Sequence, residues 1–348
     1  MQDSTIKRIH RRKLIFFLGF LLAFFLGLTF VKNLLISFLL AFVGFYILSP
    51  LVDVLERKGL SRGWSAAVPF FIFLSVFGIL LQLLLPLLVS QFDELKTDFP
   101  KYSDGFTRIL MDLKMKISHF SDAAVAERIA SQIQEYLQTL TQNIFRDIPE
   151  VVSNSLTVLV LAPFLTFFML LDGKRWIRNI LSLVPNSFFE LALNLNYQIS
   201  TQMGGFVRAR LLETLIIGFL TWIGLIMIQF PYALFLAVLA GVLNLIPYIG
   251  PFIGAAPAFL IAMTNTGIPV NYTLLCLVYI FAQVIDMAII VPLVVAKIVN
   301  LHPVTVVLAV MVGSQMMGIL GMIISIPLAS VMKVTFQSLY AHSTDFRR

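Results

Sequence analysis

Residues 231–263 read PYALFLAVLAGVLNLIPYIGPFIGAAPAFLIAM, an apolar stretch that prolines and glycines interrupt near its middle. Its two arms, 231–246 and 252–263, flank the sequence Pro-Tyr-Ile-Gly-Pro. A helix needs about 20 apolar residues to cross the hydrocarbon core of a bilayer, so each arm is marginal for crossing alone. The stretch therefore predicts a broken helical hairpin at membrane depth.

A second broken pair follows one full-length span. Residues 272–295 are long enough to cross a bilayer, and the short apolar segments 304–317 and 319–331 then meet around Gly318 and Gly321. Two broken hairpins separated by one helix are typical of binding sites in secondary transporters. Irregular backbone persists in a membrane only against protein or a water-filled cavity, which favours re-entrant hairpins with facing tips. The alternative is two ordinary pairs of short helices with prolines as kinks.

The composition of the whole chain is that of a membrane protein. Of its 348 residues, 59% are hydrophobic and 12% are charged. About a quarter of the residues of an ordinary soluble domain are charged. A water-soluble fold could not bury this much apolar surface, so we predict an all-α polytopic membrane protein with about eight membrane segments.

The net charge of +7 does not indicate a nucleic-acid partner. The basic residues lie in short clusters beside apolar segments, where the positive-inside rule explains them. The cluster within residues 7–13 precedes an apolar run, 14–31, which we interpret as a retained first span with a cytoplasmic N-terminus. The single cysteine, Cys276, excludes an intrachain disulfide.

Changes in composition divide the chain into five predicted regions. Region 1–89 holds three spans, 14–31, 34–48 and 66–89, and region 90–150 is a soluble insert. Region 151–210 holds a fourth span, 151–171, and a cytoplasmic interfacial helix. Region 211–335 is a transport core that opens with the span 211–229, and region 336–348 is a cytoplasmic tail. The second span is expected to end at Ser49-Pro50 and the fourth at Asp172-Gly173.

Amphipathic helices are expected in two places. The insert carries ten acidic and seven basic residues, and its apolar residues at helical spacing are Val125, Ile129, Ile133, Leu137, Leu140 and Ile144. This stripe packs on a neighbour, lies on the membrane surface or binds a partner. The interfacial helix is predicted from Ile177, Ile180, Leu181 and Leu191.

Asp286 is the main candidate for a functional residue, because it is the only residue of 272–295 that is charged at neutral pH. Burying such a charge at the bilayer centre costs on the order of 3 kcal/mol. A carboxyl group there can bind a proton or a cation and so couple an ion gradient to transport. Gln283, one turn earlier on the same face, could share the site. The alternative is a structural aspartate that is protonated or paired with another helix.

Other candidates are polar, proline or glycine residues at the two tips. They are Asn244, Pro247, Tyr248, Gly250 and Pro251 at the first tip, and Ser314, Gln315, Gly318 and Gly321 at the second. Helix ends that meet there aim partial charges at a substrate or ion, although each residue could equally serve helix packing. Arg208, Arg210 and Glu213, at the start of the fifth span, are interpreted as solvated anchors.

Motifs spread from about residue 33 to residue 333 carry a family resemblance. They are Ser49-Pro50-Leu51-Val52 through Leu60-Ser61-Arg62, Leu171-Asp172-Gly173 with Arg175, Asn244-Leu245-Ile246-Pro247-Tyr248-Ile249-Gly250-Pro251 with Gly254 and Pro257, Gln283, Asp286 and Pro292, Leu301-His302-Pro303, Gly318-Ile319-Leu320-Gly321, and Ile326-Pro327. Together they resemble the autoinducer-2 exporter (AI-2E) family of permease-like bacterial membrane proteins.

The resemblance implies a polytopic inner-membrane protein with a soluble insert that forms homo-oligomers and exports small molecules. Some relatives are associated with sodium/proton exchange. The chain departs from the family pattern at Ala288, where an asparagine usually follows the acidic residue, and at Asp286, where glutamate is common. Both departures affect the residues that would bind sodium.

We therefore predict a secondary transporter that exports small, autoinducer-2-like molecules across the bacterial inner membrane. Coupling would be to protons or sodium through Asp286, and both termini would be cytoplasmic. The alternatives are a passive channel or oligomeric pore, a sodium/proton antiporter, and an intramembrane enzyme or scaffold that acts through the insert.

The sequence does not favour an enzyme. It contains no HExxH, no GxSxG and no paired carboxylates within a span, and it lacks the GxxxxGK[ST] loop of ATP-driven systems. We expect no cofactor and no bound metal. The expected partners are the lipid bilayer, a small-molecule substrate, protons or sodium, and further copies of the chain.

Overall fold

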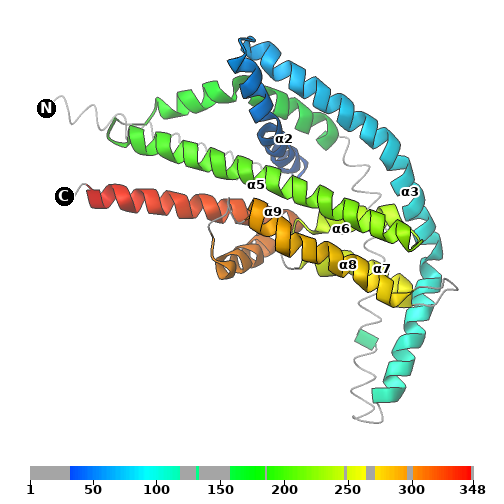
Figure 1. Cartoon of the computed structure of the whole chain (residues 1–348). Helices are drawn as coiled ribbons and strands as arrows, with labels where there is room; N and C mark the ends of the chain where they lie inside the picture. The colour runs from blue at the N-terminus through cyan, green and yellow to red at the C-terminus, as the bar shows by residue number, and fades with distance from the viewer. Residues whose placement is uncertain are drawn as a thin grey trace. The chain divides into compact units, whose positions relative to one another are not determined.

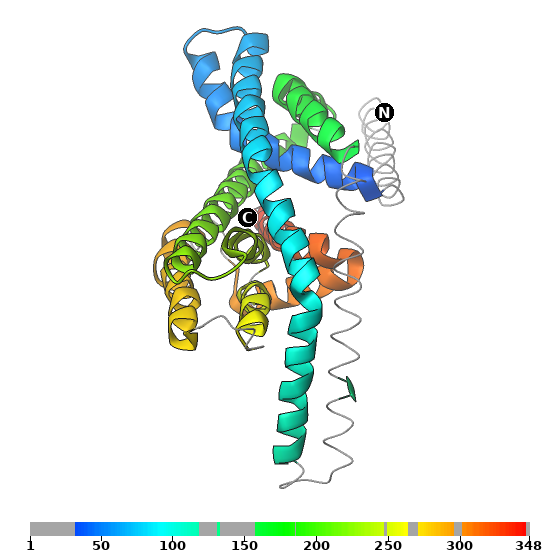
Figure 2. The same ribbon diagram turned by 90° about the vertical axis from the view of Figure 1, so that its right-hand side faces the viewer.

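The computed structural model describes residues 32–117, 131–132, 157–184, 186–246, 249–263, 271–295 and 301–345. These residues are helical apart from short turns and contain no strand, which confirms the all-α class for this part of the chain (Figures 1 and 2). The expected first span, 14–31, and the six residues of the amphipathic stripe in the insert lie outside the described residues.

Six helices among the described residues are long and apolar enough to cross a membrane. They are Leu34–Arg57, Arg62–Tyr102, Thr157–Leu181, Phe188–Met227, Tyr272–Pro292 and Gly321–Ser338. Three shorter apolar helices, Ala233–Leu243, Gly250–Met263 and Val304–Met316, coincide with predicted arms of the broken hairpins. The total of about eight membrane segments stays a prediction.

The chain divides into two compact units. The first comprises residues 1–78, 154–209 and 296–348, and the second comprises residues 79–153 and 210–295. The second unit has an apolar core around Leu225, Leu236 and Leu275, which are fully buried.

Helix α2 (Lys32–Arg57) continues through Pro50, so the predicted end of the second span at this proline was wrong. A proline inside a helix offers no N–H to the carbonyl four residues earlier, which here belongs to Tyr46. The guanidinium group of Arg208 donates to that carbonyl at 3.0 Å. A side chain from another helix thus replaces the missing backbone hydrogen bond, and Arg208 is not a solvated anchor.

Two further helices are longer than the sequence indicated. Helix α3 (Arg62–Ile117) is continuous for 56 residues and passes the expected end of the third span at residue 89 without a break. The helix Thr157–Leu181 likewise continues past Asp172-Gly173. A change from apolar to charged residues marks a change of surroundings, not the end of a helix.

The predicted interfacial helix is divided between two elements. Its residues at 177–181 belong to the last turns of the helix Thr157–Leu181, and Leu191 belongs to α5 (Asn186–Met227). A turn at residues 182–184 separates them. Helical spacing alone could not reveal this turn, because the apolar residues on both sides of it are in phase.

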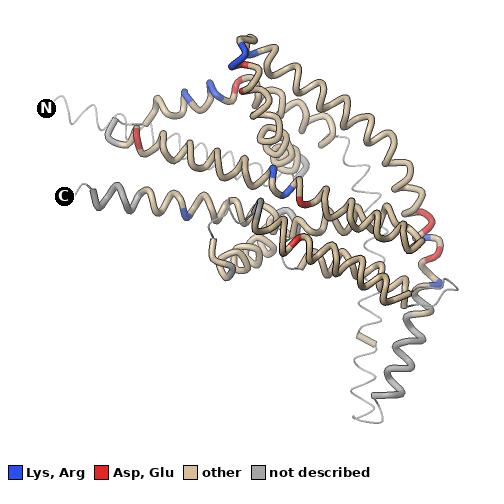
Figure 3. The backbone as a smooth tube through the Cα atoms, viewed as in Figure 1, with Lys and Arg blue, Asp and Glu red and all other residues tan. Residues whose placement is uncertain are grey.

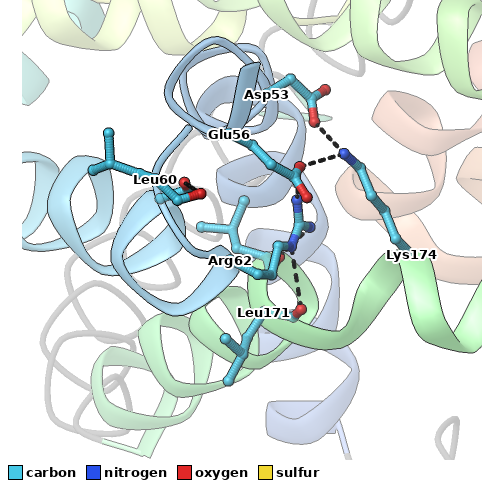
Figure 4. A network of polar contacts seen from close by, with 8 residues as sticks. Asp53, Glu56, Leu60, Arg62, Leu171 and Lys174 are labelled. Atoms are coloured by element: carbon cyan, nitrogen blue, oxygen red, sulfur yellow. Dashed lines mark hydrogen bonds and ion pairs between the residues drawn. The ribbon is translucent and has the colours of Figure 1, made fainter. Parts of the chain in front are cut away.

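A polar network joins α2, α3 and the helix Thr157–Leu181 (Figure 4). Lys174 Nζ lies 2.8 Å from Asp53 Oδ1 and 2.6 Å from Glu56 Oε2, and Arg62 Nη1 lies 2.9 Å from the same Glu56 oxygen. Arg62 also donates to the carbonyl of Leu171 at 3.3 Å. Exposed ion pairs contribute only about 0–1 kcal/mol each, so the network mainly fixes how these helix ends are aligned.

Helix α9 (Pro303–Asp345) reverses direction at Gly318, where φ is 62° and ψ is −139°. A Cβ atom on Gly313 would collide with the carbonyl oxygen of Gly321, so the two arms touch backbone to backbone. Val310 and Ile326, one from each arm, share a buried apolar cluster. The second broken pair is thus a helical hairpin, and its re-entrant character stays a prediction.

The first broken pair consists of α6 (Ala233–Leu243) and α7 (Gly250–Met263). A Cβ atom on Gly254 would lie 2.9 Å from the Cα of Ala240, and one on Gly250 would collide with the carbonyl oxygen of Leu243. These glycines let the two arms pack closely. Pro247 and Tyr248, which the sequence placed at the tip, lie outside the described residues.

Replacing Gly318 with alanine should lower the free energy of unfolding by about 1–3 kcal/mol, because this backbone conformation is open essentially to glycine alone. Denaturant unfolding of the purified protein in detergent would measure the change. Gly78→Ala in α3 is the control, since its Cβ would meet nothing within 4 Å. Equal stabilities of the two variants would contradict the chain reversal at Gly318.

Candidate functional site

Four polar side chains, Arg210, Glu213, Asn244 and Asp286, gather inside the second unit. We call them the polar cluster. Glu213, Asn244 and Asp286 are only 2%, 4% and 5% exposed. Figure 3 shows neighbouring basic and acidic positions partway along α5, away from the other charged groups, which gather mainly near the ends of helices and along the lower part of α3. Charged groups buried to this extent are rare unless they are paired or functional.

The contacts within the polar cluster centre on Glu213. Arg210 Nη1 lies 2.6 Å from Glu213 Oε1, and Asn244 Nδ2 donates to the same oxygen at 3.2 Å. Asn244 also lies close to Asp286. The amide side chain is therefore next to both carboxyl groups.

Close backbone packing brings α5 and α6 together at the cluster. A Cβ atom on Gly241 would lie 2.7 Å from the carbonyl oxygen of Thr214, and one on Gly218 would lie 3.4 Å from that of Ala237. Asn244 follows as the C-cap of α6, with its backbone N–H donating to Ala240. Small residues at this helix crossing thus bring the asparagine side chain into contact with Glu213.

Asp286 lies at a change of helix type. Helix α8 (Tyr272–Ile285) is followed by a π-helical segment, Asp286–Val295, which the sequence predicted as part of one regular span. Pro292 lies inside this segment and lacks the N–H for one α-helical hydrogen bond. π-Helical turns are rare and occur frequently at functional sites.

The polar cluster carries one positive charge and two potential negative charges. Glu213 Oε2 and Asp286 Oδ1 are buried and have no hydrogen-bond partner in the part of the chain that the structure describes. An unpaired negative charge in such surroundings is costly. A proton on one carboxyl group, or one monovalent cation between the two, would neutralise the cluster.

The predicted candidates do not all join this cluster. Asp286 and Asn244 meet there, and Gln283 is half-buried one turn before Asp286, whose N–H reaches the Gln283 carbonyl. Gly250 and Pro251 begin α7, and Gly250 packs closely against Leu243 of α6.

The candidates at the second tip belong to the first unit. Ser314 is half-buried, Gln315 and Gly318 are exposed, and Gly321 is buried against Gly313. They form the chain reversal of α9.

The interpretation of Arg210 and Glu213 as solvated anchors was wrong. Glu213 is buried more deeply than Asp286, and the side chain of Arg210 is only 12% exposed. The available signal was the spacing of three residues, which puts opposite charges one turn apart at the start of an apolar helix. Whether such a pair faces water or another helix depends on α6 and α8, which are distant in sequence.

Comparison with known proteins gives one family match. The model of a family described as AI-2E family transporter matches residues 18–341. The match therefore includes all four residues of the polar cluster.

Individual relatives are similar over most of their length. "Putative transport protein YueF" of Bacillus subtilis (strain 168) is 29% identical over 320 residues, which cover 89% of this chain and 85% of the relative. "Putative permease PerM" of Escherichia coli (strain K12) is 27% identical over 89% of this chain and 88% of its own. "AI-2 transport protein TqsA" of the same strain is 22% identical, with 93% and 92% covered. These names indicate transport proteins rather than enzymes.

Arg210→Ala should destabilise the protein by about 3–5 kcal/mol, because it leaves the buried Glu213 without its ion pair. Adding Glu213→Gln should recover most of this loss, since the residue left behind is then neutral. Unfolding of both variants in detergent would measure the effect, with the exposed Arg175→Ala as control. If the two substitutions simply add, the ion pair does not stabilise the fold.

Proposed function

We propose that this chain, which belongs to the AI-2E transporter family, is a secondary transporter that binds its coupling ion, a proton or sodium, at the polar cluster. The membership confirms the resemblance that the sequence motifs indicated. The single observation that carries the proposal is the buried pair Glu213 and Asp286, with one guanidinium group for two carboxyl groups.

Neutralisation gives the polar cluster a physical route to coupling. The cluster without an ion has an excess negative charge, and enclosing that charge in apolar surroundings is costly. The cluster with an ion is neutral and is enclosed at lower cost. Ion binding thus favours the enclosed state over the open state. A ligand can shift such an equilibrium only by the difference between its binding free energies for the two states.

The end of α6 adds to the preference for a cation. Asn244 is the C-cap of α6, and the last carbonyl groups of a helix carry a partial negative charge. The amide oxygen of Asn244, and the oxygens of Glu213 and Asp286 that have no hydrogen-bond partner among the described residues, are the kind of ligands that hard cations prefer.

The substrate and the direction of transport are part of the proposal. TqsA is named as an AI-2 transport protein, which supports a small, autoinducer-2-like molecule as the substrate. We propose export across the inner membrane as the direction of transport. Basic residues beside the spans, such as Lys174, Arg175 and Arg178, support cytoplasmic termini by the positive-inside rule. The second hairpin, around Gly318, would contribute to the substrate path, and copies of the chain would associate.

A sodium/proton antiporter is the second candidate. The same excess charge could be neutralised by sodium in one state and by a proton in another, without a further substrate. A passive pore is less well supported, because it requires no buried carboxyl pair.

Flux in proteoliposomes under imposed pH or sodium gradients would test the proposal. Asp286→Asn and Glu213→Gln should each lower ion-coupled flux by about tenfold or more, within the usual range of coupling between sites. Asp93→Asn, an exposed carboxylate on α3, should retain flux. Unchanged flux in Asp286→Asn would make this residue structural, and gradient-independent flux would indicate a channel.

A further inference from the structure

Each of the two buried acids, Glu213 and Asp286, has a buried hydroxyl group about two turns away along the chain, that of Thr221 on α5 and that of Tyr279 on α8. Glu213, Ile217, Thr221 and Leu225 are spaced by four residues and are 2%, 6%, 1% and 0% exposed, so they form one buried ridge of α5. On α8, Tyr279 precedes Asp286 by seven residues. Each hydroxyl-bearing residue is thus about two helical turns, roughly 10–12 Å along the helix axis, from the acidic residue.

The helices α5 and α8 are antiparallel neighbours, so the two hydroxyl groups lie at a similar level. A Cβ atom on Gly224 would lie 2.5 Å from Val278 Cγ1, and Glu213 lies near Asp286. The helices run side by side in Figures 1 and 2. Thr221 lies one turn from Gly224, and Tyr279 follows Val278.

These hydroxyl groups have no hydrogen-bond partner among the described residues. Thr221 Oγ1, Tyr279 Oη and Thr214 Oγ1, which adjoins Glu213, are buried without a hydrogen bond in the part of the chain that the structure describes. A buried polar group without a partner costs about 1–3 kcal/mol. Thr214 lies on α5 where it meets Gly241 of α6, and the ring of Tyr279 packs on Phe259 of α7. Three such groups around α5 and α8 call for water, since a buried water molecule typically satisfies about three polar groups.

We propose that Thr214, Thr221 and Tyr279 line a hydrated path along α5 and α8, inside the second unit, through which protons reach Glu213 and Asp286. This inference rests on the proposed ion binding at the polar cluster and specifies its access route. Hydroxyl groups both donate and accept hydrogen bonds, so with intervening water they can pass a proton along without changing their net charge.

The path is closed at its far end in this structure. Beyond the hydroxyl level lie Leu225 and Leu275, which pack with Leu236 and are fully buried. Apolar constrictions of this kind block passage by excluding water. Protons on that side therefore reach the acids only when this leucine cluster loosens.

Cysteine labelling would test the hydration directly. In a Cys276→Ser background, Thr221→Cys should react with a small methanethiosulfonate reagent about tenfold faster than Leu225→Cys, one turn further along α5, because water reaches only the former. Equal reaction rates would overturn the path. This readout does not depend on transport, so it separates the path from the proposed function.

Proton flux in proteoliposomes gives the second measurement. Thr221→Val combined with Tyr279→Phe should lower proton flux about tenfold, because both relaying hydroxyl groups are lost. Thr273→Val and Tyr197→Phe remove exposed hydroxyl groups and should leave flux unchanged. Flux that depends on Asp286 but is unchanged in the double variant would overturn the path alone. Flux that is indifferent to Asp286 would overturn the ion site itself.

Discussion

Every backbone amide that lies away from water needs a partner, and this requirement decides where the chain can interrupt its helices. The start of α6 has no side-chain cap of its own, and Gln91 of α3 supplies one by accepting the N–H of Phe235 at 2.9 Å. At Pro50 the carbonyl of Tyr46 loses its helical partner, and Arg208, 162 residues away in sequence, replaces it. Irregular backbone is thus tied to particular side chains on other helices.

Two residues of the polar cluster lie where regular helices end. Asn244 ends α6, and Asp286 begins the π-helical segment after α8. Only Glu213 and Arg210 lie in the interior of a regular helix, and they bind each other one turn apart. The positions where α6 and α8 end therefore also place Asn244 and Asp286 beside Glu213. The glycines of α5 and α6 let these two helices pack closely enough for this contact.

Much of this arrangement follows from local sequence. Apolar length predicts the helices, prolines and glycines predict the two hairpins, and a lone carboxyl group in an apolar run identifies Asp286. The missed features depend on contacts between distant segments. The helix through Pro50 needs Arg208, and the burial of Glu213 needs α6 and α8 to cover it. The π-helical segment after Ile285 leaves no signature that differs from an ordinary proline-containing span.

The continuity of α3 has a geometric consequence. A helix of 56 residues is about 84 Å long at 1.5 Å per residue, whereas a bilayer with its headgroups is about 40–45 Å thick. Unless it lies nearly flat, such a helix cannot be contained in lipid. Tyr102 of α3 still packs in the apolar core of the second unit, so the charged turns beyond it are the part that extends into water. That reach is set by the number of helical residues, as in a rigid spacer, and not by a flexible linker.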